Sequence, residues 1–236
     1  MVSRKPDATV RAFRDPIELR KLPHALRTLC WRLPLELSQL LARLTFTAIT
    51  RCCDRRSLKE YLPHHGATFP ETTVTSGQRE LLLRAIQATD NLDLPIVELG
   101  AWPGVTTAAI AMATQRPLHV VGPSCDPSGD DADLRAMQER TRELANVKHI
   151  RMSSGEAARA LRQESFSVVF VDAIHDYLNT WFDFKVWGSL LTPGGMIAFH
   201  DVDDHAGANL ACRRILKASR FALWGYCPNL AIFQRK

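Results

Sequence analysis

The chain has 236 residues, of which 46% are apolar and 23% are charged. These proportions exclude a largely disordered chain, and the length suits one domain of about 150 residues with an extension. The net charge of +5 is unevenly spread, because residues 1–60 hold 13 Lys and Arg against 6 Asp and Glu. Residues 61–236 hold 17 against 19, so the basic character belongs to an N-terminal arm.

Targeting and membrane-spanning patterns do not stand out in this arm. Residues 1–7 are polar and no apolar run follows them, so we expect no secretory signal. Residues 33–50 are too short and too interrupted, by Glu36 and Arg43, to cross a membrane. The six cysteines form no C-x-x-C pair, and we interpret them as reduced thiols of a cytoplasmic protein.

The arm itself shows two helical patterns. The first covers residues 16–31, and the second begins at Pro34 and carries a stripe of Leu37, Leu40, Leu41 and Leu44. We expect this stripe to pack on the main domain or on a second subunit, with residues 17–55 as the homo-oligomer contact. A lid over a site, or a helix lying on a membrane surface, is the alternative. We assign residues 1–70 to a basic helical extension with a linker, and residues 71–236 to the main domain.

From residue 75 onward, short apolar runs alternate with helical patterns. Thr75 and Gln78 resemble a capping box and predict a helix that runs to Ala88. Five strand–helix units and a final hairpin then predict an α/β, Rossmann-like, doubly wound sheet of seven mostly parallel strands with an antiparallel C-terminal hairpin. The predicted strands are 95–99, 118–122, 147–152, 168–172, 196–200, 221–226 and 230–234, and the helices between them are 106–114, 132–144, 155–163, 180–191 and 206–218.

The first strand of this sheet is followed by glycines, at the edge where open α/β sheets bind ligands. Residues 97–104 read V-E-L-G-A-W-P-G. Gly100 allows a sharp turn, Gly104 allows close packing as the helix starts, and Glu98 is placed to hold a cationic ligand group. The G-x-x-x-G spacing after an acid favours S-adenosylmethionine (SAM) over a dinucleotide, which prefers G-x-G-x-x-G. We expect cofactor contacts at Glu98, Gly100, Ala101, Trp102 and Gly104.

The next two strands offer weaker signals. Asp126, after the second strand, is the candidate for the ribose hydroxyls of the cofactor, although Asp130, Asp131 and Asp133 follow closely. Ser154, after the third strand, lies in a polar turn that suits either the adenine edge or the cap of a helix.

The densest polar cluster follows the fourth and fifth strands. Asp172 ends the fourth strand, His175 follows it, and His200-Asp201 ends the fifth, so adjacent strand ends bring them together. Methyl transfer to a hydroxyl needs a base, and histidine has a suitable pKa. Carboxylates also hold Mg²⁺, which would orient and acidify a hydroxyl. The expected catalytic residues are His175, Asp172 and Asp201, with Asp172 also touching the cofactor and Asp172, Asp201 and His200 as the metal set.

With these motifs assembled, residues 71–236 resemble the class I SAM-dependent methyltransferases. Within that class the domain resembles macrocin-type sugar O-methyltransferases and cephalosporin-hydroxylase-like proteins. Five motifs in order carry the resemblance: V-E-x-G-x-x-x-G-x-S/T at 97–106, D-x-x-H-x-Y at 172–177, D-x-x-x-W at 183–187, L-x-P-G-G at 191–195 and H-D at 200–201.

The resemblance implies SAM contacts at Glu98, Gly100 and Gly104, a base at His175, and Mg²⁺ at Asp172 and Asp201. The chain departs from the pattern in two places. Relatives often carry two consecutive acids where His200-Asp201 stands, and the acid after the second strand is displaced.

The function that we predict is methylation of a hydroxyl on a small molecule, such as a sugar or a secondary metabolite. Three alternatives stay open: a hydroxylase-like or hydrolytic metal enzyme on this scaffold, a non-catalytic module, and an RNA methyltransferase. The pI near 9.0 favours nucleic acid, but the main domain is slightly acidic and has no basic-aromatic patch. We therefore expect neither a nucleic-acid partner nor a peripheral membrane contact.

Overall fold

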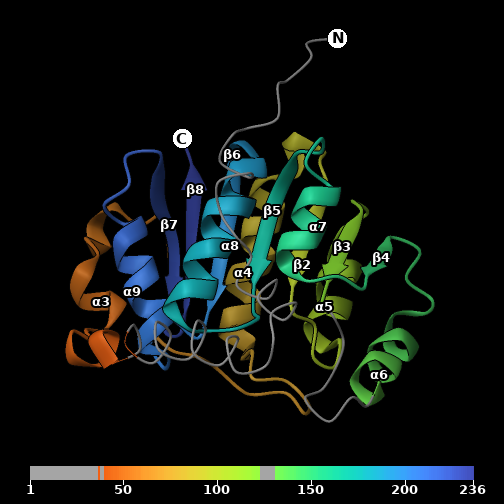
Figure 1. The fold of residues 1–236 in the computed structure, drawn as a ribbon, viewed down its shortest axis with the longest axis horizontal. Helices are drawn as coiled ribbons and strands as arrows, with labels where there is room; N and C mark the ends of the chain where they lie inside the picture. Colours follow the sequence, from red (N-terminus) through yellow and green to blue (C-terminus); the bar gives the residue numbers. More distant parts are fainter. Residues whose placement is uncertain (1–36, 38–39, 123–130) are drawn as a thin grey trace, which may run out of the picture.

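A computed structural model of the chain describes residue 37, residues 40–122 and residues 131–236. Its strands form one eight-stranded sheet in the order β1-β7-β8-β6-β5-β2-β3-β4 (Figure 1). Strand β8 runs antiparallel to β6 and β7, and the other neighbours are parallel. The bounds are β1 Glu60–Tyr61, β2 Ile96–Leu99, β3 Leu118–Val121, β4 Val147–Ile150, β5 Phe166–Val171, β6 Leu191–His200, β7 Phe221–Cys227 and β8 Leu230–Arg235.

This sheet confirms the predicted Rossmann-like architecture with its antiparallel C-terminal hairpin. The addition is β1, a two-residue strand in the segment before the main domain, which pairs with β7 through Glu60 and Tyr61. A two-residue strand has too few residues to show the alternating pattern from which strands are recognised in a sequence.

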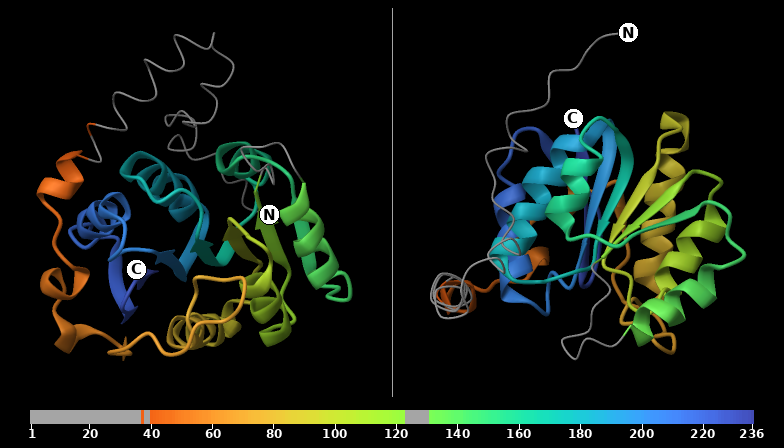
Figure 2. Two further views of the ribbon diagram at one scale, coloured as in Figure 1. Left: turned by 90° about the horizontal axis from the view of Figure 1, so that it is seen from below. Right: turned by 45° about the vertical axis from the view of Figure 1, so that its right-hand side comes forward.

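Helices cover both faces of the sheet (Figures 1 and 2). One face packs against α4 (Ser76–Ala88), α5 (Val105–Ala113) and α6 (Ala132–Thr141). The other packs against α7 (Ser154–Ala160), α8 (Tyr177–Leu190) and α9 (Ala206–Ile215). Because helices bury both faces, the central strands are continuous apolar runs: every residue of β2, β3 and β5 is buried.

The order of the strands locates the ligand crevice. From β2 the chain moves outward to β3 and β4, and it then returns to β5 on the other side of β2. Such a reversal leaves a crevice at the carboxyl ends of the two strands. The last residues of β2 and β5, Leu99 and Val171, are register partners, so the turns that follow them start side by side.

The segment before the main domain departs from its predicted form. Residues 40–44 are helical, but the helix stops there and a separate short helix, α3, covers Ile49–Cys52. The predicted leucine stripe is exposed, whereas Ala42 and Ile49 are buried. Of the two partners predicted for the stripe, the main domain is therefore wrong for the described residues, and the second subunit stays a prediction. At the end of this helix the Thr45 hydroxyl and backbone nitrogen both donate to the Leu41 carbonyl, at 2.9 Å and 3.1 Å.

The predicted helix over residues 16–31 lies outside the described residues. Within the part of the chain that the structure describes, no helix combines the length and the apolar character needed to cross a membrane.

Candidate active site

The turn from β2 to α5 forms the first wall of the site. Gly100 and Gly104 both adopt positive φ angles, of 85° and 92°, which side chains disfavour. A Cβ on Gly100 would stand 2.1 Å from the carbonyl oxygen of Asp172, and a Cβ on Gly104 would stand 2.8 Å from Met137. The glycines therefore let the ends of β2 and β5 touch and let α6 pack on the start of α5. Ala101 is half-buried and Trp102 is exposed between them.

Glu98 lies beneath this turn and is only 1% exposed. Its carboxylate accepts a hydrogen bond of 2.5 Å from the Thr107 hydroxyl of α5. Burial raises the pKa of Glu98 to about 8, Thr107 opposes the rise, and the negative charge of Asp172 adds to it. No described residue forms an ion pair with Glu98, so a cationic ligand group would stabilise its charged form. The bare glycine backbone and this acid together fit the predicted cofactor.

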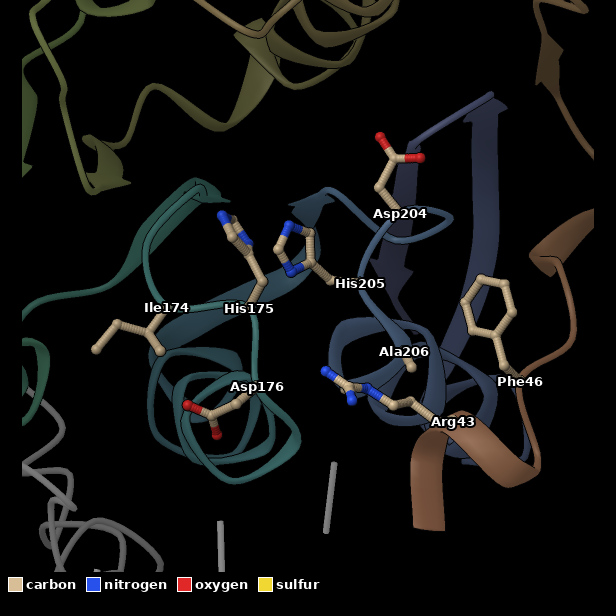
Figure 3. A pocket seen from close by; sticks show the side chains of 9 residues that line it. Arg43, Phe46, Ile174, His175, Asp176, Asp204, His205 and Ala206 are labelled. Carbon is tan, nitrogen blue, oxygen red and sulfur yellow. The ribbon is translucent and has the colours of Figure 1, made fainter. Parts of the chain in front are cut away.

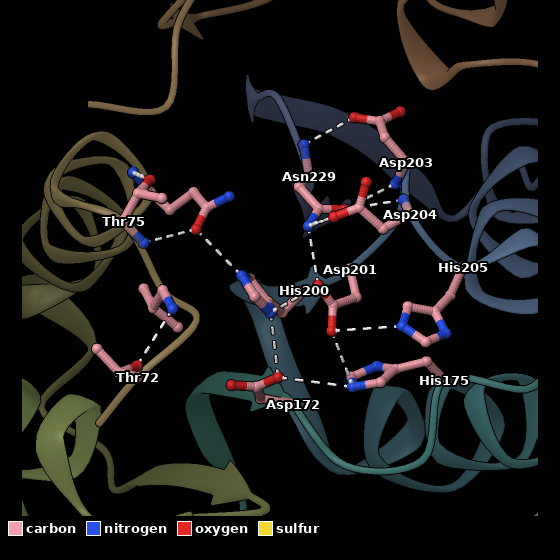
Figure 4. Close-up of polar contacts among 12 residues, drawn as sticks. Thr72, Thr75, Asp172, His175, His200, Asp201, Asp203, Asp204, His205 and Asn229 are labelled. Atoms are coloured by element: carbon pink, nitrogen blue, oxygen red, sulfur yellow. Dashed lines mark hydrogen bonds and ion pairs between the residues drawn. The ribbon is translucent and has the colours of Figure 1, made fainter. Parts of the chain in front are cut away.

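Two carboxylates and three imidazoles meet where β5 and β6 end (Figure 4). His175 Nε2 lies 3.1 Å from Asp201 Oδ2 and 3.9 Å from Asp172 Oδ1. His205 Nε2 lies 3.9 Å from Asp201 Oδ2, and its ring centroid is 4.9 Å from that of His175. The structure thus brings the predicted catalytic residues together and adds His205, which sequence reasoning missed because it lies in a loop without a motif.

His200 is the fully buried member of the cluster. Its Nε2 lies 3.1 Å from the amide oxygen of Gln78, whose Nε2 donates to the Pro228 carbonyl, so His200 Nε2 is the donor. Its Nδ1 lies 3.2 Å from Asp172 Oδ1 and 3.4 Å from Asp201 Oδ1. Burial lowers the pKa of His200, but the two carboxylates overcome this effect and raise it to about 10. His200 is therefore an imidazolium that balances the paired acids.

The same contacts keep Asp201 ionised. Burial raises its pKa, but His200, His175 and His205 outweigh burial and lower the pKa to about 2. The backbone of Asp201 is left-handed, with φ of 58°, an uncommon conformation that turns its carboxylate away from the line of β6.

For His175, the candidate base, burial affects the pKa more than the neighbouring carboxylates do. Burial lowers its pKa, and the carboxylates of Asp201 and Asp172 only partly offset the fall. A neutral imidazole beside an ionised carboxylate can accept a proton and be stabilised as it becomes charged. Its backbone carbonyl accepts a hydrogen bond from Ala208 of α9 at 3.0 Å, and Gly207 approaches the next turn so closely that a Cβ would meet the Tyr177 nitrogen at 2.4 Å.

Asn229, in the turn between β7 and β8, supports the cluster from behind. Its side-chain nitrogen donates to Asp201 Oδ1 at 2.8 Å and to Asp204 Oδ2 at 2.7 Å. Its side-chain oxygen accepts from the backbone nitrogens of Asp203 and Asp204. Asp203 itself binds Tyr226 and the backbone of Ile49, which is a structural task. The sequence signal for Asn229 was its place after Pro228 in a hairpin turn, where it adopts a φ of 67°.

Two further residues, Asp126 and Ser154, were predicted to contact the cofactor. Asp126 lies outside the described residues. Ser154 is the first residue of α7, inside a capping box made by Ser153 and Glu156, and its hydroxyl contacts Asp183 and accepts a 2.8 Å hydrogen bond from Trp187. Helix packing thus occupies the Ser154 hydroxyl, and its contact with the cofactor stays a prediction.

The donor set resembles a metal site in part. Asp172, His175 and Asp201 each offer a ligand atom, and these atoms lie within 4.8 Å of one another. The set contains one nitrogen and only two carboxylates, whereas Mg²⁺ prefers oxygen ligands. His200, the predicted third ligand, instead faces one oxygen of each carboxylate as a cation.

A pocket of about 560 Å³ opens beside the cluster (Figure 3). His175 and His205 line it on the side where they contact Asp201, and Ile174 adds an apolar wall. Arg43 and Phe46, from the segment before the main domain, close the opposite side. Its size is typical of sites for small molecules.

The comparisons with known proteins agree with this architecture. Residues 97–202, from β2 to just beyond Asp201, match the family described as methyltransferase domain. No protein of curated function matches the sequence.

Solved structures with a similar fold include several O-methyltransferases. One, from Bacillus cereus in complex with SAH, is 18% identical over 74% of this chain and 84% of its own, with a TM-score of 0.53. TomG from Streptomyces achromogenes, in complex with SAM and involved in tomaymycin synthesis, is 20% identical over 71% and 83%, with a TM-score of 0.52. A Staphylococcus aureus protein, provisionally described as a caffeoyl-CoA O-methyltransferase, is 12% identical over 70% and 86%, with a TM-score of 0.57. These likenesses show that the chain shares the Rossmann-like fold of these proteins.

Proposed function

Because residues 97–202 match a methyltransferase domain, we propose that this chain transfers the methyl group of SAM to a hydroxyl oxygen of a small molecule. The observation that carries the proposal is the place of His175. It follows β5, where the Asp172 carbonyl closely approaches Gly100 of the glycine turn, and its imidazole lines the pocket. A candidate base on the wall of a space for an acceptor is thus three residues from the strand end that touches the glycine turn.

The proposed division of labour follows from the contacts. Bound SAM supplies an electrophilic methyl group on its sulfonium. Glu98 and the backbone after β2 bind the cofactor, and His175 takes the proton of the acceptor hydroxyl. Asp201, 3.1 Å from His175, stabilises the imidazolium that results. General-base catalysis of this kind contributes roughly 10²–10⁴-fold to a rate.

A role for Mg²⁺ is a second part of this proposal. Asp172 and Asp201 would be its carboxylate ligands, and the cation would lower the pKa of the acceptor hydroxyl. We place base catalysis first because His200 already balances the two acids. On this view EDTA leaves activity unchanged, and a loss that Mg²⁺ restores would make the cation part of the site.

Two variants test the proposal. We expect His175→Ala to bind SAM within about threefold of the wild type and to lose methyl transfer by at least about 100-fold, since only the base is removed. Calorimetric titration with SAM and release of SAH with a panel of hydroxylated acceptors measure the two quantities. His64→Ala, at an exposed histidine away from the cluster, is the matched control. Wild-type protein that fails to bind SAM would overturn the proposal, and loss of SAM binding in His175→Ala would move His175 to the cofactor site.

A further inference from the structure

The wall of the pocket opposite His175 and His205 carries an arginine with no assigned task. Arg43 is exposed, and no described side chain forms a hydrogen bond or an ion pair with its guanidinium. Figure 3 shows its side chain reaching past Ala206 toward the side of the pocket formed by Ile174 and Asp176. An arginine that faces a cavity in this way offers a fork of donors that matches a carboxylate.

The two acids that line the pocket do not use Arg43. Asp176 caps α8, and its two oxygens accept hydrogen bonds from the backbone and the side chain of Asn179. Asp204 accepts the 2.7 Å hydrogen bond from Asn229. Neither acid lies within ion-pair distance of Arg43, so the guanidinium stays available to a ligand. The same acids would repel a doubly charged phosphate more than a singly charged carboxylate.

The position of Arg43 is set by contacts on both sides of it. Ala42 is buried, and the Thr45 carbonyl accepts a hydrogen bond from Arg213 of α9. Ile49 is buried in the main core, and its backbone nitrogen donates to Asp203 at 3.2 Å. Arg43 is therefore held on the wall of the pocket by the same domain that carries His175.

The remaining walls indicate what the rest of the ligand looks like. Phe46 and Ile174 are 42% and 45% exposed although they are apolar, and both line the pocket. Binding of an apolar or aromatic ring would remove them from water. His175 lies on the wall across from Arg43, so the hydroxyl and the charged group belong at different ends of the ligand.

We propose that the methyl acceptor is a hydroxylated carboxylic acid with an apolar or aromatic body, whose carboxylate binds Arg43 while its hydroxyl faces His175. This inference rests on the proposed function for the role of His175, and it adds the class of the substrate. It makes Arg43 a specificity-determining residue and gives the segment before the main domain a part in the site.

The test compares pairs of probes that differ only in charge. Dihydroxybenzoate and hydroxycinnamate are titrated into the full chain, each against its own methyl ester, with and without SAH. We expect the wild type to bind at least one acid about tenfold or more tightly than its ester, because a hydrogen bond to a charged group is lost in the ester. Arg43→Gln should lose this preference, and Arg43→Lys should keep part of it.

Arg51→Gln provides the matched control, because Arg51 is an exposed arginine of α3 that does not line the pocket. This variant should keep the full preference for the acid. Absence of a preference in every pair, or a preference that survives in Arg43→Gln, would overturn the proposal. The readout is binding, so it is independent of turnover. A wild type that prefers the acids but binds no SAM would refute the proposed methyl transfer and leave the anion site standing.

Discussion

At the scale of single residues, Glu98 is the group whose surroundings most strongly oppose its ordinary charge. It is buried, it accepts one hydrogen bond, from Thr107, and its pKa rises to about 8 because burial disfavours the carboxylate. In the free protein Glu98 is therefore protonated at neutral pH. A ligand that presents an ammonium group beneath the glycine turn would favour the carboxylate and expel the proton.

This gives a prediction for the pH dependence of SAM binding. The free-state pKa is raised, so binding below pH 8 must release a proton, and affinity should rise with pH by up to about tenfold per unit before levelling off above pH 8. Calorimetry near pH 7 in two buffers of different ionisation enthalpy counts the released protons. Glu98→Gln should remove that release. Equal proton release in the variant and the wild type would show that Glu98 is not the group that titrates.

At the scale of elements, Arg116 ties together the end of the sheet away from the site. Its guanidinium is 6% exposed and donates to the carbonyls of Ile86 and Thr89, at the end of α4, and to the Ser167 hydroxyl of β5. It also lies 3.1 Å from Asp90. Burial lowers the pKa of Arg116, and Asp90 offsets part of the fall. A single side chain thus satisfies polar groups from a helix, a turn and a strand.

We predict that Arg116→Met lowers the free energy of unfolding by about 2–4 kcal/mol, since it leaves buried carbonyls without donors. Chemical denaturation measures the loss. SAM affinity at low temperature should not change, because the network lies at the amino ends of the strands. Arg162→Met, at an exposed arginine, should be neutral within about 0.5 kcal/mol. An Arg116→Met protein as stable as the wild type would mean that water replaces the guanidinium.

At the scale of the whole molecule, the segment before the main domain is part of the fold as well as of the pocket. Strand β1 extends the sheet along β7, and Lys59 and Leu62 bond the backbone of Trp224 and Tyr226. Ile49 fills the core between the sheet and α9. The exposed leucines at 37, 40, 41 and 44 remain the candidates for the predicted contact between subunits.

Deletion of residues 1–52 tests this role. We expect the free energy of unfolding to fall by about 2–5 kcal/mol, the cost of losing a buried isoleucine from a core. SAM binding should persist, because the glycine turn and Glu98 stay in place, whereas binding of the acid probes should be lost with Arg43 and Phe46. Deletion of residues 1–36 is the control and should preserve both. Full stability and full acid binding after the longer deletion would contradict a role for the segment.

Much of the domain could be predicted from the sequence alone. Short strand patterns, alternating with helical patterns, predicted every strand of the sheet except the two-residue β1, although β6 begins at Leu191 and not at Met196. The G-x-x-x-G turn, the Thr75–Gln78 capping box and the ends of β5 and β6 also lay where they were expected. The signals for these features are local, because an apolar run, a glycine turn with positive φ and a helix cap are each made by residues that are near in the chain.

What only the tertiary structure decided depends on residues that are far apart in the chain. Gln78 contacts His200 across 122 positions, and Asn229 contacts Asp201 across 28. Arg43 lines the same pocket as His175, the candidate general base. The charge of His200 also could not be predicted from the sequence. The two carboxylates raise its pKa more than burial lowers it, and they meet His200 only because β5 and β6 lie side by side. The partner of the leucine stripe was undecided for the same reason: helical spacing shows that one face is apolar, but not whether the main domain or a second subunit covers it.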